Sequence, residues 1–190
     1  MAQRDPALPD DRDRVPAEPG GADPAQRDAV RAVRAALGRL EVEWVERSFG
    51  RIGVTMPGER KLRTECVLEV GSRAVDLHAF VIRRPEQNDA EVYRFLLERN
   101  LRMRRIGFAV DHVGDIHLAG SLPLELFRDA STATVQLDAV LGEVLNASDS
   151  CFNRILELGF ADSIRREWAW RLRRGESTRN LEAFRHLRPT

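Results

Sequence analysis

Histidines and acidic residues cluster at one point of this 190-residue chain, where they could bind a metal or act as acid and base. Asp111, His112, Asp115 and His117 lie within seven positions of one another. The same residues suit a polar hairpin turn. His117 also alternates with the apolar Ile116, so its side chain should point to the opposite face of a strand. We therefore expect a turn here, with no metal site and no catalytic residue.

The remaining reactive side chains point to no reaction either. Cys66 and Cys151 both have apolar neighbours, and buried thiols in such surroundings are usually inert. His78 alternates with Leu77, which is typical of a histidine on the exposed face of a strand. The chain contains no nucleotide-binding glycine motif and no nucleophile elbow. We expect a non-enzymatic protein without a cofactor.

The segment 163–174 combines two tryptophans with five arginines. On a helix, Trp168 and Trp170 point about 200° apart and cannot share one narrow face. One interpretation is a buried stripe of Ile164, Trp168 and Leu172 with solvated arginines around it. In another, one tryptophan packs internally while the other anchors a partner protein. The candidate partner-binding residues are Arg165, Arg166, Trp168, Trp170, Arg171, Arg173 and Arg174.

Hydrophobic periodicity predicts the elements that position these residues. Apolar residues up to Trp44 recur at spacings of three and four, which predicts a helix over 26–48. Strict alternation then predicts three antiparallel strands, at 52–56, 66–70 and 75–81.

A second helix is predicted over 88–101, with Asn88 as its cap and Glu91 in the capping-box position. A two-stranded hairpin follows at 106–118. The rest of the chain is expected to be helical, with a break at 146–149. Strands grouped in hairpins, with helices between the groups, predict a two-layer α+β fold rather than a parallel sheet.

Phe80 and Ile82 alternate away from Leu77 and Val81 on the third predicted strand. They should therefore face away from the core side of the sheet. Two large apolar side chains in such a place require a cover. We expect another helix or a second copy of the chain to cover them, which predicts a two-fold homodimer.

Composition divides the chain into three parts. Residues 1–25 hold five of the nine prolines and have a net charge of −3, so we expect a disordered acidic tail. Residues 26–175 should form a single domain, and 176–190 a basic extension. No apolar stretch is long enough for a membrane span or a signal peptide, so we expect a cytoplasmic protein.

Four stretches resemble the YbjN family of bacterial sensory transduction regulators, particularly its actinobacterial form. They read GERKLRTECVLEVG at 58–71, HAFVIRRPEQNDAEVYRFLLERNLRM at 78–103, FAVDHVGDIHLAGSLPL at 108–124 and LELGFADSIRREWAWRLRRGE at 156–176. The resemblance spans 59–174 and implies a type III secretion chaperone-like fold. It also implies action by protein contact, often as a dimer, and it supplies no catalytic residue.

Three functions follow from these observations. The first is a non-enzymatic regulator or adaptor that binds another protein. The second is a chaperone that holds an extended segment of its client. The third is a nucleic-acid-binding regulator that uses the arginines and tryptophans of 165–174, against which the zero net charge of the chain argues. We expect the first.

Overall fold

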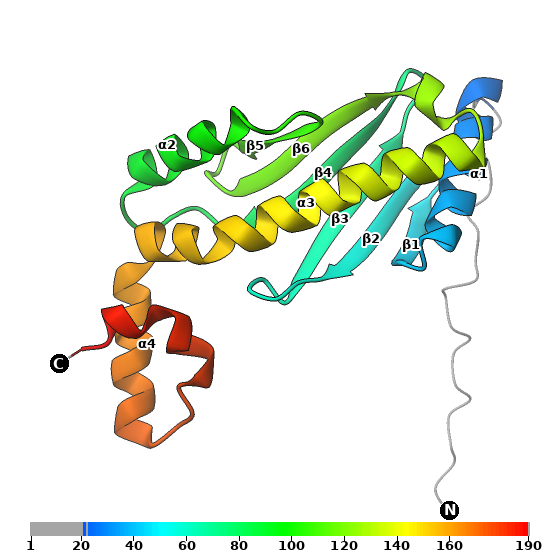
Figure 1. The fold of residues 1–190 in the computed structure, drawn as a ribbon. Helices are drawn as coiled ribbons and strands as arrows, with labels where there is room; N and C mark the ends of the chain where they lie inside the picture. The colour runs from blue at the N-terminus through cyan, green and yellow to red at the C-terminus, as the bar shows by residue number, and fades with distance from the viewer. Residues whose placement is uncertain (1–20, 22, 190) are drawn as a thin grey trace, which may run out of the picture.

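The computed structural model of the chain describes residue 21 and residues 23–189 (Figure 1). The expected tail at 1–25 therefore lies almost entirely outside the described residues, although α1 already begins at Pro24. The elements in chain order are α1 (Pro24–Arg39), β1 (Glu43–Ser48), β2 (Arg51–Pro57), β3 (Arg63–Val70), β4 (Ala74–Ile82), α2 (Asp89–Asn100), β5 (Ile106–Val110), β6 (Ile116–Pro123), η2 (Leu124–Phe127), α3 (Ala130–Gly159), α4 (Ala161–Arg174) and η3 (Arg179–Leu187).

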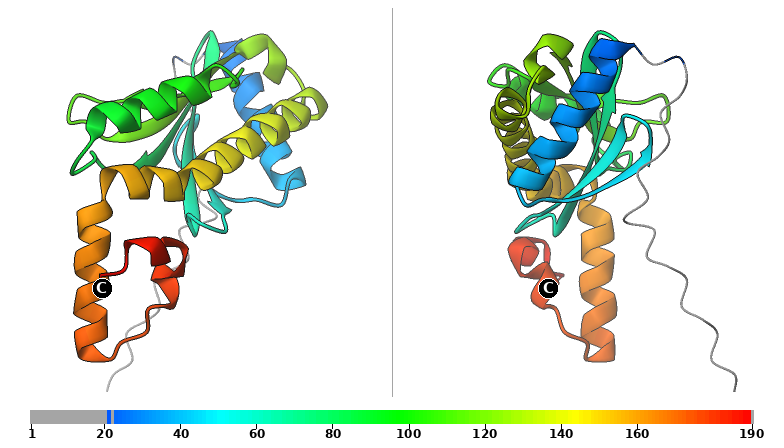
Figure 2. Two further views of the ribbon diagram at one scale, coloured as in Figure 1. Left: turned by 60° about the vertical axis from the view of Figure 1, so that its left-hand side comes forward. Right: turned by 90° about the vertical axis from the view of Figure 1, so that its right-hand side faces the viewer.

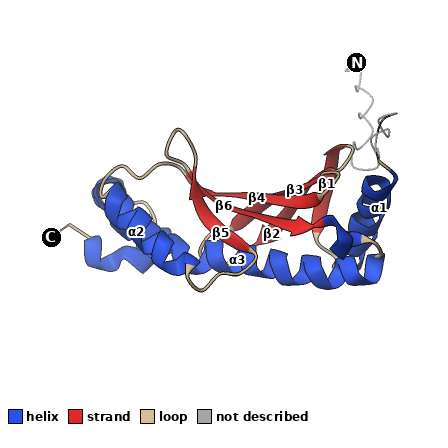
Figure 3. Ribbon diagram, turned by 90° about the horizontal axis from the view of Figure 1, so that it is seen from above, coloured by secondary structure: helices blue, strands red, loops and turns tan. Residues whose placement is uncertain are grey.

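The strands form one antiparallel sheet in the order β1-β2-β3-β4-β6-β5. Helices α1 and α3 cover one face of this sheet, with α2 beside β5 (Figures 1 and 3). Within the described part of the chain, no helix covers the opposite face. The predicted α+β class is therefore confirmed, with six strands in place of the five expected.

Strand β1 forms an edge of the sheet where the sequence predicted helix. Helix α1 ends at Arg39, and Glu41 adopts a left-handed φ of 54° that turns the chain back. The side chain of Glu46, only 3% exposed, accepts hydrogen bonds from Arg34 Nε at 2.7 Å and Nη2 at 3.0 Å. It also accepts one from the backbone N–H of Gly50 at 2.8 Å. This buried pair holds β1 against α1, and the helix predicted to continue past residue 39 is wrong.

Helix α3 runs without interruption for 30 residues across the sheet. The predicted break at 146–149 is wrong, because its polar residues make tertiary contacts instead. Ser148 is buried, and its Oγ lies 2.8 Å from Oγ1 of Thr64 on β3. Asp149 Oδ1 accepts hydrogen bonds from the backbone N–H groups of Arg60 at 2.7 Å and Lys61 at 3.0 Å. These contacts join α3 to the β2–β3 hairpin.

Helix α2 begins one residue after the predicted cap. Asn88 adopts a left-handed φ of 51°, and its side chain makes no hydrogen bond to the start of α2. Its amide donates instead to the backbone carbonyl of Leu158 at 3.2 Å. Asn88 therefore connects the start of α2 to the end of α3, and the predicted capping box is wrong.

The main core lies between the sheet and helices α1 and α3. Its largest fully buried side chains include Phe127, Leu37, Ile52, Leu68, Ile116 and Leu137. A second, smaller apolar cluster joins α4 to η3. None of the described helices is both long enough and apolar enough to cross a membrane.

Candidate functional site

Helix α4 and segment η3 together form a C-terminal arm (residues 161–187) that projects from the end of α3, away from the sheet (Figure 2). The arm has its own apolar centre. Ile164 and Trp168 of α4 pack against Leu181 and Phe184 of η3, and Trp168 is only 2% exposed. Trp168 is thus internal to the arm, and it is η3 that buries it.

The corner between α3 and α4 depends on a close approach at Gly159. A Cβ placed there would lie 2.9 Å from Cβ of Pro85 and 3.3 Å from Cγ2 of Val92. The carbonyl of Gly159 accepts hydrogen bonds from the backbone N–H groups of Glu86 and Gln87 at 2.9 and 3.2 Å. The loop after β4 therefore fixes the direction in which the arm leaves the body.

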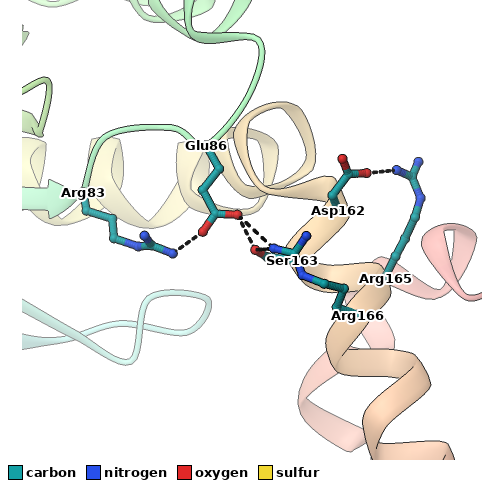
Figure 4. A network of polar contacts seen from close by, with 6 residues as sticks. All are labelled: Arg83, Glu86, Asp162, Ser163, Arg165 and Arg166. Carbon is teal, nitrogen blue, oxygen red and sulfur yellow. Dashed lines mark hydrogen bonds and ion pairs between the residues drawn. The ribbon is translucent and has the colours of Figure 1, made fainter.

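Polar contacts around Glu86 hold the first turn of α4 to the same loop (Figure 4). The carboxylate accepts hydrogen bonds from the hydroxyl of Ser163 and from the guanidinium of Arg83, and it lies 3.6 Å from Nη2 of Arg166. The hydrogen bond from Ser163, followed by the contacts with the arginines, lowers the pKa of Glu86, although burial acts in the opposite direction. Arg166 thus belongs to this group of contacts, although its side chain is 71% exposed.

Two more of the five arginines of α4 pair with acids of the same helix. Arg165 contacts Asp162 at 2.6 Å. Arg171 contacts Glu167 at 2.6 Å and also donates to the carbonyl of Ser177. Neighbouring carboxylates therefore partly neutralise these cations.

The exposed side chains of α4 that form no ion pair with a described residue lie near the end of this helix. Trp170 is 38% exposed, and the guanidinium of Arg174 lies 4.9 Å from its ring centroid. Leu172 is 43% exposed, so it does not share a buried stripe with Trp168. Arg173 forms no ion pair with any described residue. Of the seven residues proposed from the sequence, Trp170, Arg173 and Arg174 thus form one exposed aromatic and basic surface.

The uncovered face of the sheet carries a second unusual group. The rings of His78 and His117 are 4.4 Å apart, and Phe80 meets His117 edge-on at 5.5 Å. Lys61 Nζ lies 5.7 Å from the centroid of Phe80, and Asp111 Oδ2 lies 3.3 Å from Nε2 of His117. Burial, followed by the charge of His117, lowers the pKa of His78.

Phe80 and Ile82 do not share this face. Phe80 is 45% exposed and pairs with His117. A β-bulge follows, so that Ile82 pairs with Ile116, which is buried in the core. Ile82 accordingly packs partly against the core, and the expected alternation fails at this point.

The polar residues singled out at 111–117 surround a hairpin turn. Asp111 accepts hydrogen bonds from the backbone N–H groups of Val113 and Asp115, and His112 is exposed in the same turn. No group of three or more potential metal ligands occurs in the described ranges. Burial raises the pKa of the Cys66 thiol to about 12.

Sequence reasoning placed His78, Phe80 and His117 on an exposed face without bringing them together. Their proximity comes from the pairing of β4 with β6, which skips α2 and β5 in the chain. Local alternation carries no information on such long-range pairing. The turn motif at 111–115 could have suggested only that His117 lies near Asp111.

Comparison with known proteins places these features in a family. A 53% identical relative is the uncharacterized protein Rv0487 of Mycobacterium tuberculosis, and a 50% identical one is the uncharacterized protein ML2442 of Mycobacterium leprae. Each match extends over 137 residues, 72% of this chain and 72% of the relative. Among solved structures, the ExsC-ExsE complex aligns at 14% identity with a TM-score of 0.45, over 70% of this chain and 96% of the other.

The model of the YbjN family, described as "Putative bacterial sensory transduction regulator", matches residues 27–157. The matched region includes most of α1 and all of β1 and β2, which the resemblance over 59–174 left out, and it ends before the C-terminal arm. Because the match covers more than half of the chain, this protein belongs to the YbjN family.

Proposed function

We propose that this chain is a non-enzymatic regulatory or adaptor protein that acts by binding another protein through its C-terminal arm. The observation that carries the proposal is the exposed Trp170, stacked on Arg174 at the end of a projecting helix. Tryptophan and arginine are the residues most often central to protein interfaces. Glu86 and Gly159 fix the position of the arm, so that less ordering entropy opposes binding. We also propose a cytoplasmic location, which the two free, buried cysteines support.

The test compares Trp170→Ala with Leu97→Ala, which removes a 65% exposed side chain of α2, outside the arm. A partner is first identified by crosslinking the full chain in cells, then purified, and its affinity is measured with each variant. Trp170→Ala should weaken binding at least tenfold and Leu97→Ala should not. If both variants bind the partner with equal affinity, the arm is not part of the interface.

The state of the partner distinguishes the adaptor from the chaperone. An adaptor should bind a folded protein, whereas a chaperone should bind one extended segment. Hydrogen exchange of the partner, alone and in the complex, measures this difference directly. A nucleic-acid binder would instead bind oligonucleotides with a steep dependence on salt.

We also propose that two copies associate through the uncovered face of the sheet around Phe80. The support is its 45% exposure beside the stacked histidines, since an exposed phenylalanine on an open sheet face is a typical contact between subunits. Light scattering at micromolar concentration should give a dimer that Phe80→Glu converts to a monomer. Val113→Glu, which changes an exposed turn residue, is the control.

A further inference from the structure

A hollow of about 650 Å³ lies between the start of β1, the β2–β3 hairpin and the middle of α3. We call it the α3 groove. It is lined by residues 40–43, 55–57, 62–63 and 138–145, none of which belongs to the C-terminal arm. Its wall is largely apolar and includes Leu40, Val42, Met56, Leu62, Leu141 and Leu145.

Two residues of the α3 groove are poorly explained by folding alone. Gly142 lies inside the longest helix, where glycine is unfavourable, and a Cβ placed there would meet nothing within 4 Å. Leu62 lies in the hairpin loop and is 81% exposed. Gly142 leaves the groove open to solvent, and Leu62 adds apolar surface at its edge.

The charge around the α3 groove is negative. Glu41, Glu43 and Asp138 line it, and none of them forms an ion pair with a described residue. Arg63 is the only basic residue of the lining, and its Nε lies 3.2 Å from the carboxylate of Glu65. A bound segment with an apolar side chain between positive charges would therefore complement both the apolar wall of the groove and the acidic residues around it.

From this arrangement we infer that the α3 groove binds a segment of another protein in which basic residues flank one large apolar side chain. Residues 1–20 of this chain do not meet that description, because their five acids outnumber their three arginines. The inference goes beyond the proposed function, since the groove contains no residue of the arm and the two carry opposite charges.

The direct test uses three fluorescein-labelled peptides and the full chain in fluorescence anisotropy. The peptides are Arg-Arg-Gly-Trp-Gly-Arg-Arg, its glutamate counterpart Glu-Glu-Gly-Trp-Gly-Glu-Glu, and Arg-Arg-Gly-Ala-Gly-Arg-Arg without the tryptophan. The first should bind at least tenfold more tightly than either of the others, because only it has both the charge and the apolar side chain. Equal binding of all three would overturn the inference.

Variants then locate the binding site. Gly142→Leu places a side chain in the α3 groove and should weaken binding of the arginine–tryptophan peptide at least tenfold. Gly38→Leu is the matched control, because Gly38 also faces open space in a helix but does not line the groove. Asp138→Lys reverses one rim charge without filling the groove and should weaken binding severalfold. Unchanged affinity in both groove variants would place the peptide elsewhere.

Two further measurements distinguish the α3 groove from the arm, and another protein from a second copy of the chain. Trp170→Ala should leave peptide binding unchanged, so the groove is tested independently of the arm. Sedimentation of the full chain tests the other occupant. If the chain self-associates, and Gly142→Leu abolishes this association while Gly38→Leu preserves it, the groove binds a second copy of the chain. That result would overturn the inference that it binds another protein.

Discussion

The neighbouring histidines on the open sheet face should make stability depend on pH. The pKa of His78 is lowered by burial and by His117, whereas Glu69 and Asp111 act in the opposite direction. Because the folded state disfavours the protonated imidazole, the unfolded chain binds more protons as pH falls below about 6.5. Stability should therefore be fully present above about pH 6.5 and be lost progressively below it.

Thermal unfolding between about pH 7.5 and pH 5.5 checks this prediction. The melting temperature of the wild type should fall as the pH is lowered, and that of the His78→Asn variant should fall by less. His112→Asn, which changes an exposed histidine in the neighbouring turn, is the control. If His78→Asn falls as steeply as the wild type, His78 is not the source of the dependence.

A buried hydroxyl pair joins β3 to α3 and should respond unequally to removal of its two members. Ser148 Oγ can still donate to the carbonyl of Leu145 at 3.3 Å when Thr64 is replaced by valine. Ser148→Ala, in contrast, leaves the Thr64 hydroxyl buried without its partner. We expect Ser148→Ala to lower the free energy of unfolding by about 1–3 kcal/mol, and Thr64→Val to lower it by less. Urea denaturation measures both, and the reverse order would contradict the assignment.

Two glycines of α3 provide a matched pair at the scale of the element. Gly142→Ala should raise the free energy of unfolding by about 0.5–1 kcal/mol, because the new methyl group meets open space and favours helix. Gly159→Ala should lower it by about 1–3 kcal/mol, because its methyl group would press on Pro85 at the corner with α4. Urea denaturation of both variants checks the prediction, and equal effects would contradict it.

The arm should unfold separately from the sheet and its helices, since its apolar cluster is distinct from the main core. Trp168→Ala removes the most buried side chain of that cluster. Hydrogen exchange should then accelerate across α4 and η3 while β3, β4 and α3 keep their protection. Trp170→Ala is the control and should change exchange little, because Trp170 is partly exposed. Uniform acceleration over the whole chain would show instead that the arm and body unfold together.

The sequence predicts an element correctly where its apolar residues fit only one pattern, helical or alternating. It fails where the same residues fit both patterns. Strands β2 and β3 alternate strictly in burial, as expected, and β4 does so up to Val81, at its bulge. The spacing of Leu40 and Trp44 suits a helix, yet Val42 and Trp44 also alternate, so the sequence predicts a helix where the structure has β1. Local polarity at 146–149 indicated a break in α3, whereas Ser148 has its partner 84 residues away in the sequence.

The candidate sites were less predictable than the fold for the same reason. The sequence identified the arginines and tryptophans of α4, but it could not tell that η3 buries Trp168 and leaves Trp170 at the surface. The α3 groove combines residues from α1–β1, the hairpin and α3. Such a site exists only after long-range packing, and no local pattern indicates it.

At the scale of the whole molecule, opposite charges are separated along the chain. Residues 161–190 contain eight arginines and four acids, whereas residues 1–20 contain five acids and three arginines. The zero net charge is therefore the sum of unlike regions. We expect the tethered N-terminal segment to compete with other acidic partners for the basic arm, because tethering raises a local concentration to roughly millimolar.

Deleting residues 1–20 should therefore affect binding and leave folding nearly unchanged. Helix α1 begins at Pro24, and Gln26 Nε2 still donates to the carbonyl of Val70 at 2.7 Å, so the melting temperature should hardly change. An acidic probe, a labelled decaglutamate peptide, should bind the shortened chain severalfold more tightly at low salt. Each exposed ion pair contributes only about 0–1 kcal/mol and is screened, so the difference should vanish at about 0.5 M salt. A melting temperature that falls by many degrees would show instead that the segment packs against the body, and the deletion would then report on folding rather than on competition for the arm.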